Sequence, residues 1–301
     1  MTKEETMATS EVDGAIHQSA GPSATVSKRS DRATPVANVG PTTTFERVPF
    51  GRIYAHAVRQ EQAIARIFEQ VASDFGGFVV TPNVDHICIA ETDPELRAAY
   101  KEAFLSLPDG QPLLWMARAM GCALPEKVSG SDIITPLLVE AGQQGKTVFF
   151  LGSTEGSCVE AARRLSTSIP RLRIVGWDSP DFDPYGENHE QLFRGFERIR
   201  NAKPDLVLFA FGNPKQEYAM WRYQEQYYPA VGLGVGASID FLAGKVERAP
   251  QWMSRIGMEW LFRLTQEPGR LWRRYLVRDR AILGIFLRTR RQVRSRHDRL
   301  R

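Results

Sequence analysis

At 301 residues the chain has room for one large α/β domain and a further element, and its 43% hydrophobic content is enough for a substantial core. Its three cysteines, Cys88, Cys122 and Cys158, form no CxxC pair, which argues against a disulfide framework or zinc site and fits a reducing cytosol. No uncharged apolar run reaches about 18 residues, and the chain begins with polar and acidic residues. We therefore expect neither a membrane-spanning helix nor a signal peptide.

The net charge of +4 is unevenly distributed. Residues 248–301 contain 15 Arg, no Lys and four acidic residues, which gives this segment a charge of +11 and leaves −7 for the rest. The asymmetry points to an anionic partner for the C-terminal segment: a phosphate-rich ligand, an anionic membrane or nucleic acid. The choice of Arg over Lys favours fork-like phosphate recognition, although high-GC codon usage explains it as simply.

The pattern along the chain alternates between strands and helices. Residues 1–44 are rich in Ser, Thr, Ala, Pro and Gly, which predicts a disordered N-terminal tail. We expect helices at residues 55–72, 93–104, 133–143, 156–168 and 187–202. We expect strands at residues 78–80, 106–107, 147–151, 174–175, 206–211 and 230–234, with a further element beginning at 84–90. This alternation predicts an α/β fold with right-handed crossovers and a doubly wound, mostly parallel, Rossmann-like sheet.

Polar clusters follow these strands. The run 206–211 is apolar throughout, as in a strand buried on both faces, and it ends abruptly in the cluster 212–217. Ligands of open α/β folds bind outside the carboxyl ends of the strands. Each loop taken alone is equally an ordinary surface turn, but several of them at the same sheet edge favour a binding site.

Individual residues in these loops suggest roles. Asp109 precedes Gly110, which permits a sharp turn that would bring the carboxylate into a cleft as a general base; a simple Asp-Gly turn is the commoner alternative. Asn213 and Gln216 offer neutral amides for a diphosphate or sugar. Lys215 could neutralise phosphate, although a lysine in a loop is usually only solvated.

Glycine runs and histidines add weaker signals. Gly232, Gly234 and Gly236 allow close approach to a nucleotide but lack the spacing of a dinucleotide fingerprint. The run 152–154 before a helix could seat an anion or be a capped connection. His86 beside Asp85 suggests relay or metal chemistry. No other core histidine supplies a second ligand, since His56 is expected on the first helix and His189 at the start of another, so we expect no metal and no cofactor.

The C-terminal segment interleaves Trp and Tyr with arginines, a composition that suits the headgroup layer of an anionic membrane. A helix packed on the main domain with solvated arginines is one alternative, and a nucleic-acid-binding tail is another. The interleaved aromatics and the lack of a nucleic-acid motif favour the membrane. The aromatics could instead pack against a neighbouring subunit, so a homo-oligomer stays open.

Taken together, several motifs resemble the WecG/TagA/CpsF family of bacterial glycosyltransferases (glycosyltransferase family 26). The resemblance covers about residues 50–280 in order. The matching pieces are TPN at 81–83, PDG at 108–110, GSD at 130–132, LGS at 151–153, PD…GNPKQE at 204–217, GVGASIDFLAGKVERAP at 234–250 and GMEWLFRLTQEPGRLWRRY at 257–275.

The resemblance implies a metal-independent, inverting transfer of a sugar from a UDP-sugar to a polyprenyl-diphosphate-linked saccharide. It places the enzyme on the cytoplasmic face of the membrane, in exopolysaccharide or cell-surface polymer synthesis. Family members differ in moving N-acetylmannosamine, its uronic acid or glucose. Asp109 matches the family's proposed base, with Thr81 and Gln216 as its polar partners. We expect the substrate to be bound by Asn83, Gly110, Asp132, Gly152, Ser153, Asn213, Lys215, Glu217, Gly234, Gly236, Asp240, Arg263, Arg270, Arg273 and Arg274.

The sequence thus predicts three parts: a tail at 1–44, a nucleotide-sugar-binding catalytic domain at 45–247, and a helical, Arg- and Trp-rich, membrane-docking appendage at 248–301. Two other functions compete with the transferase. One is a Rossmann-like nucleotide-dependent oxidoreductase, which the missing fingerprint disfavours. The other is a non-enzymatic protein that docks to membrane or nucleic acid through the basic segment.

Overall fold

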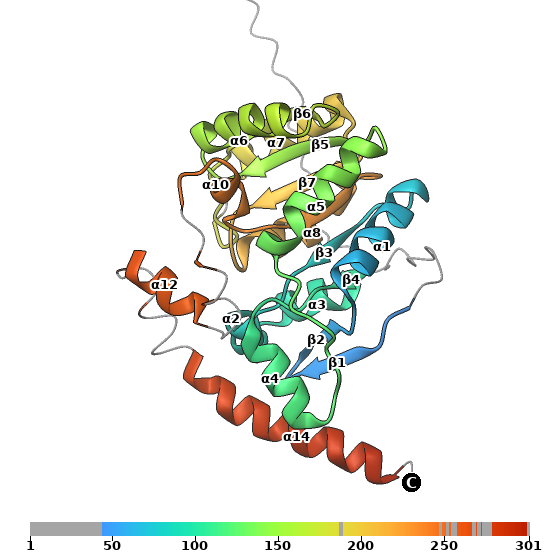
Figure 1. The fold of residues 1–301 in the computed structure, drawn as a ribbon, viewed down its shortest axis with the longest axis vertical. Coiled ribbons are helices and arrows are strands. Elements are labelled where there is room, and N and C mark those ends of the chain that lie inside the picture. The colour runs from blue at the N-terminus through green and yellow to red at the C-terminus, as the bar shows by residue number, and fades with distance from the viewer. Residues whose placement is uncertain are drawn as a thin grey trace, which may run out of the picture.

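The computed structural model describes residues 44–186, 189–246, 249–250, 258–266 and 279–299, together with Met253, Gly269 and Trp272. Its centre is a six-stranded parallel sheet with the order β4-β3-β8-β7-β5-β6 (Figure 1). The strands are β3 Gly77–Val80, β4 Leu105–Ser106, β5 Thr147–Gly152, β6 Arg173–Asp178, β7 Leu206–Ala210 and β8 Val231–Gly234. The predicted doubly wound, parallel α/β fold is confirmed.

Helices cover both faces of the sheet, as the alternation of side chains on β7 requires. Val207 and Phe209 face one core and Leu206 and Leu208 the other, all fully buried. Those packed on the Leu206 face are α1 Gln60–Ala72, α5 Gly130–Gln143, α6 Glu155–Ser168 and α10 Ser238–Leu242. Those packed on the Phe209 face are α2 Val84–Ala90, α3 Pro94–Glu102, α4 Gln111–Met120, α7 Glu190–Ala202, α8 Lys215–Arg222 and α9 Gln224–Tyr227.

The predicted first helix is wrong at its start. Ala55 and His56 belong to β2 (Ile53–His56), which pairs antiparallel with β1 (Arg47–Phe50), and α1 begins only at Gln60. The apolar residues of this stretch fit helical spacing, but pairing with β1 buries Ala55 and His56 almost completely. Here a tertiary contact overrides the local pattern.

Other predicted boundaries shift by a few residues. Helix α5 begins at Gly130, so the segment expected to precede it forms its first turn. Strand β6 continues past Val175 to Asp178, because Gly176 leaves room for the Phe149 ring, which lies 2.7 Å from the position of an added Cβ. Helix α7 begins at Glu190, with His189 at its N-cap; residues 187–188 of the predicted helix lie outside the described part.

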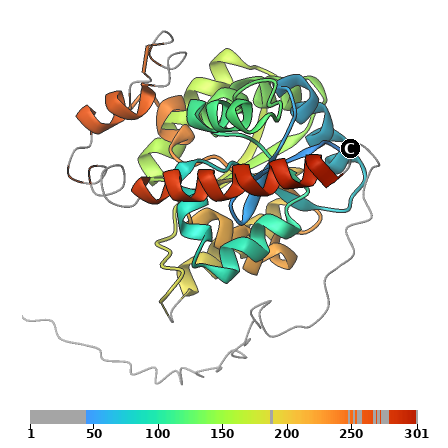
Figure 2. The ribbon, with the colours of Figure 1, turned by 90° about the horizontal axis from the view of Figure 1, so that it is seen from below.

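The last helix, α14 (Ile282–Arg299), packs on β1, α2 and α4 and runs across the lower end of the molecule (Figures 1 and 2). Ile285 is buried in the core, and Thr289 Oγ1 accepts a hydrogen bond of 3.1 Å from the Gly51 N–H. Arg288 Nη2 lies 2.6 Å from Glu91 Oε2. Part of the Arg-rich segment is therefore joined to the main domain. Among the described helices, none is both long and apolar enough to cross a membrane.

The buried His56 makes stability depend on pH. Its Nδ1 accepts a hydrogen bond of 3.0 Å from the Ser106 N–H. Burial, followed by the positive charges of Arg47 and Arg66, lowers the pKa of His56 from 6.5 to about 4. The folded protein thus favours the neutral ring. As the pH falls below 6.5 the unfolded chain takes up a proton that the folded chain refuses, so stability is lost down to about pH 4.

We expect the free energy of unfolding of the wild type to fall by about 3 kcal/mol more between pH 7 and pH 4 than that of His56→Asn. Asparagine keeps an acceptor for the Ser106 N–H but does not titrate. Urea unfolding at a series of pH values measures the difference. If the free energies of unfolding of the two proteins changed equally with pH, the lowered pKa of His56 would be contradicted.

Candidate functional site

Four loops meet at the carboxyl edge of the sheet. They follow β3, β4, β7 and β8, neighbouring strands that all run in the same direction. In Figure 1 the arrowheads of β5 and β7 point to the side on which α10 and α12 (Glu259–Gln266) lie. This is the edge at which open α/β sheets bind ligands.

Gln216 joins the loop after β7 to the loop after β8. Its Oε1 accepts a hydrogen bond of 2.9 Å from the Gly236 N–H, and its Nε2 donates one of 2.9 Å to Glu217 Oε1. The side chain is only 3% exposed. Gly234 makes this position available, because a Cβ there would lie 2.7 Å from Gln216 Nε2. Gly234, which was predicted to allow close approach of a nucleotide, thus allows close approach of the Gln216 amide. No described atom lies within 4 Å of a Cβ added at Gly236.

The loop after β3 belongs to the same network. Thr81 Oγ1 donates to the Gly234 carbonyl at 3.4 Å. Asn83 caps α2, its Oδ1 accepting from the backbone N–H groups of Asp85 and His86 at 3.1 and 3.3 Å. Asn213 Nδ2 donates to Asp85 Oδ2 at 2.8 Å. The predicted residues Thr81, Asn83, Asn213 and Gln216 are therefore brought together.

His86 has a different partner from the one its sequence position suggests. His86 Nε2 lies 3.1 Å from Glu217 Oε1, and both side chains are buried. Residues 86 and 217 are far apart in the sequence, and neither motif on its own indicates the pair. The only sequence signal was a charged residue directly after Gln216 where a helix begins.

Asp109 lies beside the loop that follows β3, half-buried, with its backbone N–H donating to the Pro82 carbonyl at 2.9 Å. Gly110 has φ +106°, which confirms the expected sharp turn. The pKa of the buried Tyr100 is raised well above its usual range by burial, then by the negative charges of Glu217 and Asp109. The corner after β4 is joined to the loop after β3 by the hydrogen bond between the Asp109 N–H and the Pro82 carbonyl. Sequence reasoning missed Tyr100, which lay within a predicted helix.

Other predicted site residues have partners within the protein. Ser153 Oγ donates to Asp240 Oδ1 at 2.8 Å, which joins the loop after β5, with Gly152, to α10. Lys215 Nζ donates to the Phe182 carbonyl at 2.7 Å. Asp132 Oδ2 accepts from Ser129 Oγ at 2.6 Å and lies 2.9 Å from Lys127 Nζ. These contacts shape the loops in which the residues lie.

The predicted arginines fall on the least described part of the chain. Arg263 is on α12, and nothing of its side chain is described; Arg270, Arg273 and Arg274 lie outside the described residues. Helix α12 is tied to the site side of the sheet by Lys127 Nζ, which lies 3.4 Å from Glu259 Oε2 as well as close to Asp132. Within the described residues, no three His, Cys, Asp or Glu side chains are grouped to hold a metal ion.

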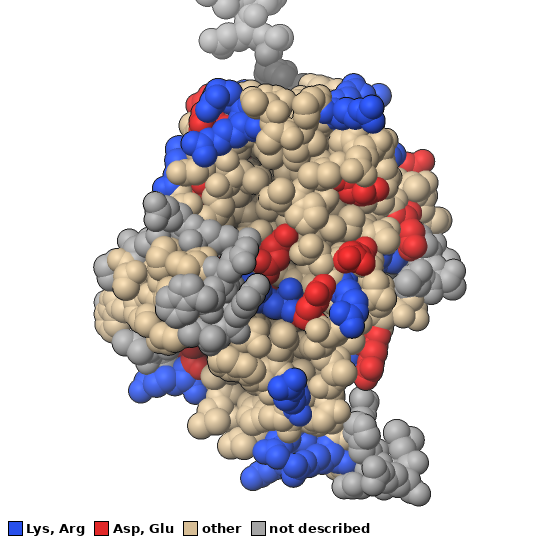
Figure 3. All heavy atoms as spheres, viewed as in Figure 1, with Lys and Arg blue, Asp and Glu red and all other residues tan. Residues whose placement is uncertain are grey.

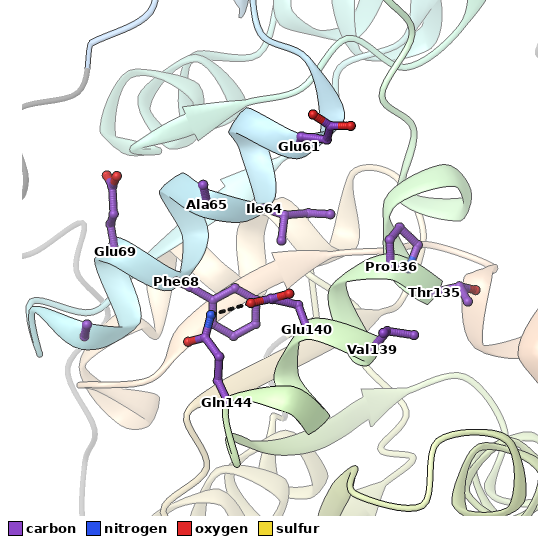
Figure 4. A pocket seen from close by; sticks show the side chains of 11 residues that line it. Glu61, Ile64, Ala65, Phe68, Glu69, Thr135, Pro136, Val139, Glu140 and Gln144 are labelled. Atoms are coloured by element: carbon purple, nitrogen blue, oxygen red, sulfur yellow. Dashed lines mark hydrogen bonds between the residues drawn. The ribbon is translucent and has the colours of Figure 1, made fainter.

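A groove of about 890 Å³ lies between α1 and α5, away from these loops (Figure 4). Its floor includes Ile64, Phe68 and Val139, and Glu140 lies at its edge, accepting a hydrogen bond of 2.7 Å from Gln144. None of the predicted site residues lines it. The chemistry suggested by the sequence lies at the carboxyl edge of the sheet.

A parallel α/β sheet with polar loops gathered at its carboxyl edge defines a protein of the Rossmann-like, doubly wound class. The model of the Glycosyl transferase WecG/TagA/CpsF family matches residues 48–296, and the chain belongs to this family, as its motifs predicted. It is therefore a transferase, and the oxidoreductase and non-enzymatic alternatives fall away.

Two relatives are named N-acetylglucosaminyldiphosphoundecaprenol N-acetyl-beta-D-mannosaminyltransferase. The protein from Bacillus spizizenii is 31% identical over 211 residues, which is 70% of this chain and 79% of the relative. The protein from Bacillus subtilis is 30% identical over 201 residues, which is 67% of this chain and 75% of the relative.

Gly234→Ala tests the close approach of Gln216. The added methyl would lie 2.7 Å from Gln216 Nε2 and 3.0 Å from Met220 Cε, so we expect a loss of about 1–3 kcal/mol in the free energy of unfolding. Gly284→Ala in α14 is the control. Nothing described lies within 4 Å of its added Cβ, so helix propensity should make that variant up to about 1 kcal/mol more stable. Equal stability of both variants in urea unfolding would argue against the close packing of Gln216 on Gly234.

Proposed function

We propose that the protein is an inverting, metal-independent glycosyltransferase that moves a sugar from a UDP-sugar to a polyprenyl-diphosphate-linked saccharide. The observation that carries the proposal is the convergence of Thr81, Asn83, Gln216 and Asp109 at one sheet edge in a chain of this family. The names of the two Bacillus relatives support the lipid-linked acceptor and favour N-acetylmannosamine as the sugar.

Asp109 is the proposed general base. It takes the proton of the acceptor hydroxyl as that oxygen attacks the anomeric carbon from the face opposite the nucleoside diphosphate. The new carbon–oxygen bond forms while the bond to the diphosphate breaks, so the configuration inverts. Its half-buried position beside Gly110 and Pro82 suits this role, since the carboxylate is near the site and not fully enclosed.

Charge that grows on the leaving diphosphate needs compensation. The described part of the site contributes carboxylates at Asp85, Asp109 and Glu217, while its lysines, Lys127 and Lys215, are engaged by protein partners. The arginines Arg263, Arg270, Arg273 and Arg274 are the proposed source of positive charge, with arginine forks bound to the phosphate oxygens.

Asp109→Asn removes the base and keeps the shape of the side chain. We expect turnover to fall about 10²- to 10⁴-fold, the usual contribution of a positioned base, with donor binding retained. Release of UDP in the presence of a polyprenyl-diphosphate-linked acceptor measures turnover. Thermal stabilisation by a panel of UDP-sugars, including UDP-N-acetylmannosamine and UDP-glucose, measures donor binding.

The matched control for that variant is Asp74→Asn. Asp74 is exposed at φ +55°, a conformation that asparagine tolerates well, and it lies before β3 at the opposite edge of the sheet. Turnover of the control should equal that of the wild type. Wild-type turnover in Asp109→Asn would remove Asp109 from the mechanism.

The membrane surface is the proposed place of reaction, with α14 as part of the docking surface. Figure 3 shows Lys and Arg side chains at the lower end of the molecule, where α14 lies in Figure 1, and further groups of them at the upper end. On the outer side of this helix, Arg291 and Arg294 are exposed, as are Leu283 and Leu287. Basic and apolar side chains together suit a headgroup layer of anionic lipid.

Reversing two charges on α14 tests this surface. We expect Arg291→Glu/Arg294→Glu to weaken binding to phosphatidylglycerol vesicles at least about tenfold, since each basic residue near such a surface contributes about 1 kcal/mol. Co-sedimentation measures it. Arg171→Glu/Arg173→Glu makes the same change at exposed positions near the amino end of β6 and should bind like the wild type. Equal loss in both variants, or in neither, would contradict docking through α14.

A further inference from the structure

Beneath the proposed site lies a buried polar pair whose role the mechanism above leaves open. His86 on α2 and Glu217 on α8 are 1% and 0% exposed, with Nε2 3.1 Å from Oε1. The ring of His86 also packs edge-on against Tyr100 of α3, with 5.9 Å between ring centroids. Burying two ionisable groups is costly unless they compensate each other, so their protonation states are constrained by their contacts.

Two contacts of His86 Nδ1 bear on its protonation: the shorter one, with Asn83 Oδ1, favours an N–H there, and the longer one, from the Asn83 backbone N–H, favours a bare nitrogen. Asn83 Oδ1 lies 2.9 Å from Nδ1, and this atom must be the oxygen because it also accepts from two backbone N–H groups. An oxygen that close requires an N–H on the ring. The Asn83 backbone N–H, which would suit an unprotonated Nδ1, is farther away at 3.3 Å.

The second ring nitrogen, Nε2, faces the Glu217 carboxylate at 3.1 Å, without the alignment of a hydrogen bond. The titratable groups around the ring are Glu217 from α8, Asp85 from α2, Tyr100 from α3 and, through Tyr100, Asp109 after β4. Negative charges on this side favour the cation over the neutral ring.

We propose that His86 is a buried imidazolium paired with Glu217, and that this pair positions the side-chain amides of Gln216 and Asn83 at the carboxyl edge of the sheet. Glu217 Oε1 receives the Gln216 Nε2–H, and His86 Nδ1–H binds Asn83 Oδ1. One ion pair therefore fixes two amides that lie in the loops after β7 and β3. Neither member is exposed, so both are positioning residues.

The pair sets which way the Gln216 amide points. With Glu217 charged, Nε2 faces Oε1 and Gln216 Oε1 is left to accept from Gly236 N–H at 2.9 Å. If the side-chain amide of Gln216 were flipped, its NH2 group would face the Gly236 N–H and its oxygen would face the Glu217 carboxylate. Among the described residues, Glu217 Oε2 has no hydrogen-bond partner, so the carboxylate depends on His86 for its charge compensation.

The first test reads the protonation of His86 directly and needs no substrate. The full-length protein is labelled with 15N-histidine, and the His86 signal is assigned from its absence in His86→Gln. We expect both ring nitrogens to be protonated at pH 8, where a free histidine is mostly neutral. A neutral His86 ring at pH 8 would overturn the proposal. Should His86→Gln not fold, the double variant His86→Gln/Glu217→Gln provides the assignment.

The second test is kinetic and rests on the proposed function. Glu217→Gln and His86→Gln should each lower kcat at least about tenfold, because a small displacement of positioning groups costs rate out of proportion to its size. The double variant replaces the ions by two neutral amides and should recover part of the lost kcat. Single variants that fold, as thermal unfolding shows, and have wild-type kcat would overturn the positioning role. So would a double variant in which the losses simply multiply.

A control separates this effect from general damage to an ion pair. Lys146 Nζ and Asp205 Oδ1 are 3.1 Å apart near the opposite edge of the sheet, and Asp205→Asn should leave kcat unchanged. A fall in kcat in that control equal to that in Glu217→Gln would count against the proposal. If no variant or wild-type protein transfers sugar, the proposed function fails, while the 15N measurement still decides the state of His86.

Discussion

The side-chain amide of Gln216 lies between the loops that follow β7 and β8 and is bonded to both. That arrangement needs a missing Cβ at Gly234 and a carboxylate at Glu217. It also needs the parallel sheet, because only strands running in the same direction bring several loops to one edge. Through Glu217 and His86 the same network reaches the loop after β3. The site is thus a set of loops that hold one another in place.

The carboxylates of this network affect how a diphosphate could bind. Carboxylates at Asp85, Asp109 and Glu217 lie in or beneath the loops of the candidate site, and a diphosphate bound there would be repelled by them unless cations stand nearby. An imidazolium at His86 neutralises one carboxylate from below. The proposed source of the remaining compensation is the segment 248–301, which has a charge of +11 and includes α12. Residues 1–247, with a net charge of −7, and residues 248–301, with a net charge of +11, are therefore complementary in charge.

The sequence predicted the sheet because its strands are short apolar runs bounded by Gly, Pro or Asn, as at Leu206–Ala210. It also predicted that the loops carrying Thr81, Asn83 and Gln216 lie at one edge, since residues after parallel strands share an edge, and the structure brings these three residues together there. It failed for Ala55 and His56, whose local pattern fits a helix and whose strand depends on pairing with β1. It failed again for His86 and Glu217, because side chains more than 100 residues apart pair only through packing of α2 on α8. The adjacent Asp85 accepts a hydrogen bond from Asn213, which the sequence did not indicate either.

Helix α2 connects the two regions that the proposed reaction needs. Its first turn carries Asp85 and His86, which bind residues of the site. Its C-cap residue, Glu91, pairs with Arg288 of α14 at 2.6 Å. The proposed docking surface on α14 is thus one short helix away from the loop after β3. Because Ile285 and Thr289 hold α14 against the hairpin of β1 and β2, removing the helix would open the core as well as the docking surface. Reversing the charges of Arg291 and Arg294 isolates the electrostatic contribution to membrane binding, because these exposed side chains lie away from the packed face of α14.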